Sequence, residues 1–302
     1  MEWLQSHFFE GEYFSRPDWD AIHARVEEDF RSLDQHQLWC DIARSWLEKL
    51  QTRLPDRYSI HESENFAFLT LEQEKYVNNL LAYLEKTLRR ILRTLPDIAS
   101  DDGYGKHVVL MFDDIDHYYS YISHFYSDDG EYGLSSGIYL NKGYGHFAFP
   151  YTNITDAEPV IVHEMTHALV SHLSIPLWLN EGMAVNVENN FTGYSGLRID
   201  NEMIQAHQGF WGEEEIQEFW NGDSFSRTDE GQRLSYELAQ LITNTLAQDY
   251  DVFVNFVNKA HFSDGGKQAA SEIYEGDLGG LLVNLLGEAD WSPKPELWSS
   301  ES

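Results

Sequence analysis

The stretch Val160-Ile161-Val162-His163-Glu164-Met165-Thr166-His167-Ala168-Leu169-Val170 contains no helix-breaking residue and predicts an α-helix. Positions i and i+4 of a helix lie on one face, so the imidazoles of His163 and His167 can reach one metal ion. Glu164 lies between them, where its carboxylate can contact a water molecule without being a ligand. This H-E-x-x-H pattern is the signature of zinc hydrolases, in which the glutamate is the general base.

A catalytic zinc ion usually takes three protein ligands, so a third must come from downstream. A longer version of the motif requires Gly at position 170 and His at position 173. The chain has Val170 and Leu173 there, which excludes that version. His172 is one residue away from the position that this longer motif requires. We interpret it as a histidine that lies in solvent or that contacts a metal ligand without binding the metal itself.

The segment Pro176-Leu177-Trp178-Leu179-Asn180-Glu181-Gly182-Met183-Ala184 offers the alternative third ligand. Pro176 ends the first helix or lies in the turn after it. A short connection allows a second, antiparallel helix to bring Glu181 back to the two imidazoles. His163, His167 and Glu181 would then hold one zinc ion per chain.

HEMTH followed by WLNEGMA resembles the gluzincin metallopeptidases, and WLNEG is very similar to the same element of the zinc aminopeptidases. The gap between His167 and Glu181 is shorter than in those aminopeptidases and looks more like that of compact peptidase-like proteins of the same clan. The likeness is specific across roughly residues 137–257. It implies a zincin-like fold, a peptide or protein substrate, and hydrolysis of peptide bonds with Glu164 as the base.

The resemblance also implies a tyrosine, some tens of residues after the glutamate ligand, that stabilises the tetrahedral intermediate. Leu234-Ser235-Tyr236-Glu237 resembles that element, which makes Tyr236 the candidate. The chain departs from the aminopeptidases at two places. Their Gly-x-Met-Glu-Asn segment corresponds here to 145–150 (GHFAFP), which has no carboxylate for a substrate's amino group, and their Lys-Gly after the tyrosine is Leu238-Ala239 here.

The composition excludes several classes of function. The 302 residues carry a formal net charge of −31, which argues against binding to nucleic acid or to an anionic membrane. The negative charge either attracts cationic substrates or keeps the protein soluble. We favour the second interpretation because the acidic residues are scattered along the chain. Hydrophobic residues make up 42% of the chain, enough for a substantial core.

Cys40 is the only cysteine, so neither an intrachain disulfide nor a cysteine-based metal site can form. We interpret it as a small buried residue on a helix. The N-terminal sequence lacks the features of a signal peptide, and no apolar stretch reaches the length of a membrane span. These features predict a cytoplasmic protein, or a secreted one if a leader has been removed.

The apolar pattern predicts an α+β fold: a small mixed sheet packed on the HExxH helix, followed by a helical half. Residues 1–60 form a helical N-terminal extension, with a stripe that includes Val26 and Leu33. Residues 61–302 form the zincin-like domain, with the sheet in 61–172 and helices in 173–302. The predicted strands are 65–70, 107–112, 137–140 and 146–149, and the main other helices are 73–94, 113–125 and 234–246.

One further expectation concerns the strand just before the zinc helix. Such a strand often forms the sheet edge that pairs with an extended peptide substrate, and 145–150 fits that place. Two rival interpretations of the motif stay open. One is a structural or degenerate zinc site on a binding protein, and the other is a surface helix without metal. A structural site would normally have a fourth histidine or cysteine, and none is obvious in the sequence.

Overall fold

The structure, a computed structural model, describes residues 2–11, 14–125, 136–151, 154–193 and 199–298. The chain divides into two compact units, Met1–Arg93 with Asp101–Ala168 and Thr94–Ser100 with Leu169–Ser302. The strands are β1 (Phe8–Phe9), β2 (Arg16–Pro17), β3 (Ser59–Glu62), β4 (Phe66–Thr70), β5 (His107–Phe112), β6 (Ile138–Leu140) and β7 (His146–Pro150). The α-helices of the first unit are α1 (Glu2–Gln5), α2 (Trp19–Asp29), α3 (Gln35–Gln51), α4 (Glu74–Thr94), α5 (Ile115–Ile122) and α6 (Ile154–Val170).

A five-stranded mixed sheet with the order β3-β4-β5-β7-β6 forms the centre of the first unit. Strands β4, β5 and β7 are parallel, whereas β3 and β6 run antiparallel to their neighbours at the two edges. All five residues of β4 are buried, and so are the last five of β5. Continuous apolar runs of this kind form strands covered on both faces, which is why these two were predictable.

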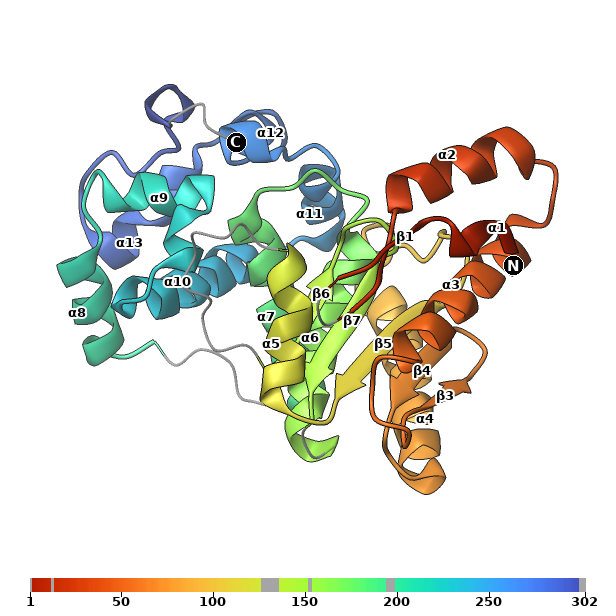
Figure 1. Ribbon diagram of the computed structural model, residues 1–302. Helices are drawn as coiled ribbons and strands as arrows, with labels where there is room; N and C mark the ends of the chain where they lie inside the picture. Colours follow the sequence, from red (N-terminus) through yellow and green to blue (C-terminus); the bar gives the residue numbers. More distant parts are fainter. Residues whose placement is uncertain (1, 12–13, 126–135, 152–153, 194–198, 299–302) are drawn as a thin grey trace. The chain divides into compact units, whose positions relative to one another are not determined.

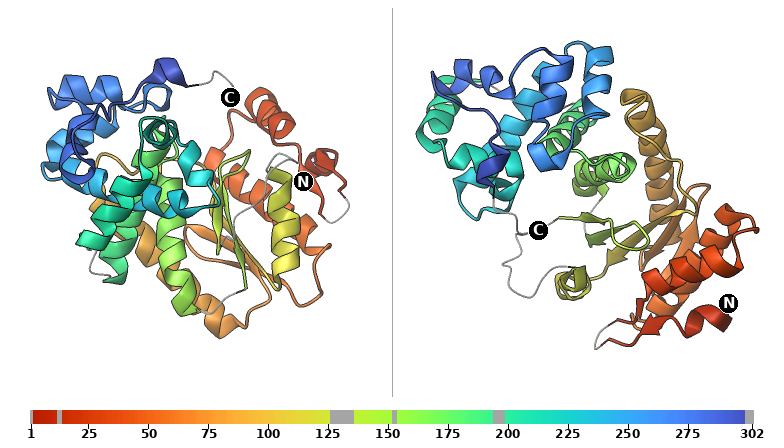
Figure 2. Two further views of the ribbon diagram at one scale, coloured as in Figure 1. Left: turned by 90° about the vertical axis from the view of Figure 1, so that its left-hand side faces the viewer. Right: turned by 90° about the horizontal axis from the view of Figure 1, so that it is seen from above.

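Helices cover both faces of this sheet (Figures 1 and 2). Alternate strand residues such as Leu69, Leu110 and Ala148 share one apolar core with α2, α3 and α5. Helices α4 and α6 lie on the opposite face. Since the chain passes from β7 almost directly into α6, the sheet positions the helix that carries HEMTH.

The N-terminal helices pack in the same unit as the sheet. The predicted apolar stripe is confirmed at Val26, which is buried, but it is wrong at Leu33, which is 52% exposed. Helix α2 ends at Asp29, so Leu33 lies in the connection to α3 and no longer follows the helical period. The expected boundary at residue 60 falls inside β3.

Among the described strands, the strand before α6 is not an edge strand, contrary to our expectation. Strand β7, which carries most of 145–150, pairs with β5 on one side and with β6 on the other. The edge is β6, because the short 141–145 turn folds it back antiparallel to β7. Any extended peptide that pairs with this side of the sheet would therefore pair with β6.

The second unit is helical in its described part. Its helices are α7 (Leu177–Thr192), α8 (Asn201–Phe210), α9 (Glu215–Asn221), α10 (Glu230–Leu246), α11 (Tyr250–Val257), α12 (Lys267–Ile273) and α13 (Val283–Leu286). The described residues also form short 3-10 helices: η1 (Ser123–Phe125) in the first unit, and η2 (Asp223–Ser226), η3 (Phe262–Asp264), η4 (Leu278–Leu281) and η5 (Pro295–Leu297) in the second. The predicted helix 234–246 is confirmed as part of α10, while α8, α9 and α12 had not been predicted. Within the described ranges, none of the helices combines the length and the apolar character that a membrane span requires.

Candidate metal centre

Helix α6 presents His163 and His167 on one face, one turn apart. Both side chains are half-buried, and their ring centroids are 4.7 Å apart with planes inclined by 80°. The intervening Met165 and Thr166 are buried. The hydroxyl of Thr166 donates to the carbonyl of Val162 at 2.8 Å, so it needs no outside partner. The two histidines are thus more accessible than the two residues just before His167.

Helix α7 carries the WLNEG element, and the first residues of this element are buried and hold the helix in place. Pro176 lies at the N-cap of α7, in the turn after α6 as predicted. Trp178 and Leu179 are completely buried, and the indole N–H of Trp178 donates to the carbonyl oxygen of Gly265 at 3.0 Å. This anchoring fixes the rotation of α7 about its axis and therefore the direction of Glu181, one turn further along.

Gly182 allows α7 and α10 to approach closely. A Cβ atom at this position would come within 2.5 Å of the carbonyl oxygen of Ala239 and 2.2 Å of the Thr243 hydroxyl oxygen. The side-chain amide of Asn186 then joins the two helices, because it donates to the carbonyl oxygens of Gly182 at 2.8 Å and Gln240 at 3.1 Å. The glycine after Glu181 is thus explained by packing.

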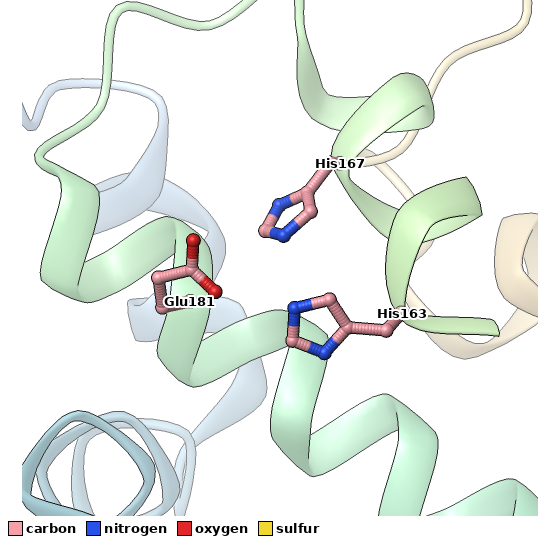
Figure 3. A group of neighbouring side chains, drawn as sticks. All are labelled: His163, His167 and Glu181. Carbon is pink, nitrogen blue, oxygen red and sulfur yellow. The ribbon is translucent and has the colours of Figure 1, made fainter. Parts of the chain in front are cut away.

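The three predicted ligands form one group. The ligand atoms of His163, His167 and Glu181 all lie within 4.8 Å of one another, and all three side chains are half-buried. Figure 3 shows the two imidazoles and the carboxylate turned toward one another. Two imidazole nitrogens and one carboxylate oxygen are a common donor set of catalytic zinc, which leaves a fourth position for water. The residues present therefore fit a zinc ion.

Glu164 is held by a contact that the sequence did not reveal. Its Oε2 atom accepts a hydrogen bond of 2.7 Å from the backbone N–H of Tyr139 on the edge strand β6. A charged acceptor makes this a strong bond that orients the carboxylate. Sequence analysis missed it because every residue except proline has such a donor, and because Tyr139 precedes Glu164 by 25 residues.

Tyr236, the candidate oxyanion donor, lies on α10, the helix that packs against α7 at Gly182. Its side chain is half-buried, and its ring meets the ring of Phe225 at a centroid distance of 5.2 Å and an angle of 87°. This contact restricts the rotation of the ring. The role of the hydroxyl group stays a prediction.

The residue after Tyr236 belongs to a buried polar chain. The indole N–H of Trp211 donates to Nδ1 of His207 at 2.9 Å, so Nε2 carries the proton of the neutral ring and donates to Glu237 at 3.2 Å. His207 is fully buried, and burial lowers its pKa, although the Glu237 carboxylate opposes this effect. Arg233 also donates to Glu237. These bonds tie α10 to α8 beside Tyr236.

The remaining candidates of the sequence analysis have other roles or stay open. His172 is exposed, in agreement with the interpretation of a histidine in solvent. Asn186 bridges two helices and so does not serve as a partner of the ligands. Asn180 and Glu188 are half-buried on α7, and they stay candidates for orienting Glu181. Cys40 is partly buried on α3, and burial raises the pKa of its thiol.

A second group of potential ligands, Asp113, Asp114 and His117, lies at the start of α5. Asp114 caps this helix by accepting from the backbone N–H of His117 at 2.8 Å. Asp113 accepts from the ring Nδ1 of His117 at 2.8 Å and from the hydroxyl of Tyr58 at 3.0 Å. Helix capping and these bonds account for the group without a metal ion.

Comparison with models of known protein families found no match, and comparison with curated proteins found none either. The function must therefore be argued from the residues and their chemistry.

Proposed function

We propose that this protein is a zinc-dependent metallopeptidase of the gluzincin type. The observation that carries the proposal is the grouping of His163, His167 and Glu181, with Glu164 next to the first histidine on the same helix. The fold supports it, because a mixed sheet packs on α6 and helices follow, as the resemblance implies. A purely structural zinc site does not need a general base next to its ligands. The position of Glu164 therefore favours a catalytic site over a structural one.

The chemistry divides among few groups. His163, His167 and Glu181 would hold the zinc ion, which when bound would supply the Lewis acidity that lowers the pKa of water and polarises the scissile carbonyl. Glu164 takes a proton from the attacking water and passes it to the leaving amine. The backbone N–H of Tyr139 holds the Glu164 carboxylate in place for this transfer. Tyr236 donates a hydrogen bond to the oxyanion that forms.

Zinc content tests the ligand set directly. We expect one zinc ion per purified wild-type chain and loss of that zinc in His167→Ala, because two remaining ligands bind far more weakly. His172→Ala is the matched control, since this exposed histidine follows α6 closely and should not affect the zinc. Metal analysis by mass spectrometry measures all three proteins. Equal zinc content in His167→Ala and the wild type would refute the site.

Removal of the Tyr236 hydroxyl should slow catalysis more than it weakens binding. We expect Tyr236→Phe to lower kcat by roughly a hundredfold, the scale for loss of one oxyanion donor, with a smaller effect on KM. Tyr274→Phe is the control, because that hydroxyl donates only to the carbonyl of Leu246, at 2.9 Å, in the same unit. Equal kcat values for both variants would remove Tyr236 from the mechanism.

The enzyme should cut peptides whose N-terminus is blocked. A strict aminopeptidase must pair the substrate's ammonium group with a carboxylate, because an unpaired buried charge is costly. Neither β6 nor β7 carries an acidic residue, and Asp156 lies in the first turn of α6, where negative charge favours the helix. Comparing one peptide in free and N-acetylated form by mass spectrometry is the measurement, and we expect both to be cleaved.

Cleavage of the free peptide alone, with release of single N-terminal residues, would contradict this prediction.

A further inference from the structure

A cavity of about 450 Å³ lies in the first unit, and none of the candidate zinc ligands lines it. Its walls come from the β2–α2 segment, α3, α5 with η1, and the turn between β6 and β7. Pockets that bind small molecules have volumes of this order, on the scale of 300–1,000 Å³. The cavity is therefore large enough for an organic molecule of modest size.

Aromatic side chains form its apolar walls. Trp19, Trp46, Tyr121 and Phe125 all line it. Trp19 meets Trp46 edge-on at a centroid distance of 5.2 Å, and Tyr121 lies 5.6 Å from Phe125. Gly143 has a φ of +71°, and a Cβ atom there would come within 2.0 Å of the Trp19 indole. The turn and the indole thus fit together, and the wall that they form is suited to a flat apolar group.

Three basic residues, Arg16, His124 and Lys142, also line the cavity. The ammonium group of Lys142 donates to the carbonyl oxygen of Phe125 at 2.8 Å. Next to Phe125, the Nε2 atom of His124 is buried and has no hydrogen-bond partner among the described residues. Arg16 lines the same cavity, and burial, followed by the positive charge of Arg16, lowers the pKa of His124.

Arg16 and Lys142 also lack a carboxylate partner in the described part of the chain, unlike most other basic residues of the first unit. This is notable in a protein with 51 acidic and only 20 basic residues. Two acidic residues line the cavity too, on the first turn of α2. Asp18 caps that helix by accepting from the N–H of Ala21 at 3.1 Å, and Asp20 is exposed. The donors near η1 are thus available to an anion.

We propose that this cavity binds a small organic anion. Its flat apolar body lies against Trp19 and Phe125, and its carboxylate accepts hydrogen bonds from Arg16 and Lys142. The arrangement combines an apolar wall with few convergent polar groups, as ligand sites do. This site does not depend on the proposed peptidase function.

Calorimetric titration with 3-phenylpropionate tests the proposal, with 3-phenylpropionamide as its neutral isostere. We expect saturable binding of the acid. We expect the uncharged amide to bind at least tenfold more weakly, a difference of about 1.4 kcal/mol or more in binding free energy. Arg16→Gln should weaken the binding of 3-phenylpropionate at least tenfold. Arg16 is exposed, so this variant should keep the fold, which circular dichroism verifies. Arg57→Gln is the matched control, because Arg57 is exposed in the same unit and does not line the cavity.

If the acid does not bind saturably at concentrations up to about 10 mM, the proposal is overturned. Any remaining binding would then be weaker than that of a specific site. Equal binding of acid and amide would show an apolar cavity without anion recognition, which also overturns it. Equal weakening by Arg16→Gln and Arg57→Gln would show a general charge effect and would have the same consequence. Loss confined to Arg16→Gln, together with a change of the His124 ring signals in the NMR spectrum on binding, would support the proposal.

Discussion

Glu164→Gln should abolish peptide hydrolysis while the zinc ion stays bound. Glutamine has nearly the same shape, and its carbonyl oxygen can still accept the hydrogen bond that the Tyr139 N–H donates at 2.7 Å. The side chain therefore keeps its place, but an amide cannot take a proton from water. Loss of a general base costs typically 10²–10⁴ in rate, so we expect kcat to fall by roughly three orders of magnitude.

The assay requires parallel measurements of turnover and zinc content. Glu158→Gln is a suitable control, since it makes the same change in charge on the same helix, more than a turn before His163. Normal turnover in Glu164→Gln would show that another group is the base, and loss of zinc would show that Glu164 is a ligand. A wild-type protein that binds zinc but cuts no peptide would favour the alternative, a zinc-binding protein that uses the site for binding only.

The second large effect is expected from a single methyl group at Gly182. In Gly182→Ala the new Cβ would meet the Ala239 carbonyl oxygen at 2.5 Å, far inside van der Waals contact, so α7 and α10 must move apart. Overpacking of this kind costs about 1–3 kcal/mol, occasionally more. The better helix propensity of alanine returns at most about 1 kcal/mol. We therefore expect a net loss of about 1–2 kcal/mol in the free energy of unfolding.

The same shift should weaken zinc binding, because Glu181 is the neighbouring residue. Gly209→Ala provides the control, since Gly209 is also inside a helix, α8, and a Cβ there would meet nothing within 4 Å. That variant should be as stable as the wild type or slightly more stable. Denaturant titration gives both free energies. An unchanged stability in Gly182→Ala would mean that the two helices separate at no cost, contrary to the packing described above.

The features predicted correctly were those that a local pattern determines. The buried strand 107–112 and helix 73–94 follow from an apolar run and an apolar period, and both are confirmed, the helix as α4. The placement of His163 and His167 follows from helix geometry alone. The edge of the sheet was not predictable in this way, because strand order depends on how the β6–β7 turn folds back and not on the strand itself.

The missed features depend on partners that are distant in the sequence. Strand β3 has a mixed burial pattern, and it is recognisable only through its pairing with β4. The reason for Gly182 appears only when α10 is known, more than 50 residues later. The cavity near η1 collects Arg16, His124 and Lys142 from three separate segments, and no spacing in the sequence relates them.

The contact between Tyr139 and Glu164 has a consequence for how this protein tolerates substitution. The donor belongs to the main chain, so an alanine scan of β6 would leave it intact and would report nothing about the base. Nineteen of the twenty amino acids supply the same N–H, and proline alone does not. Substitutions at position 139 other than proline should thus keep the link between the sheet and Glu164, the proposed base, as long as the new side chain can be packed.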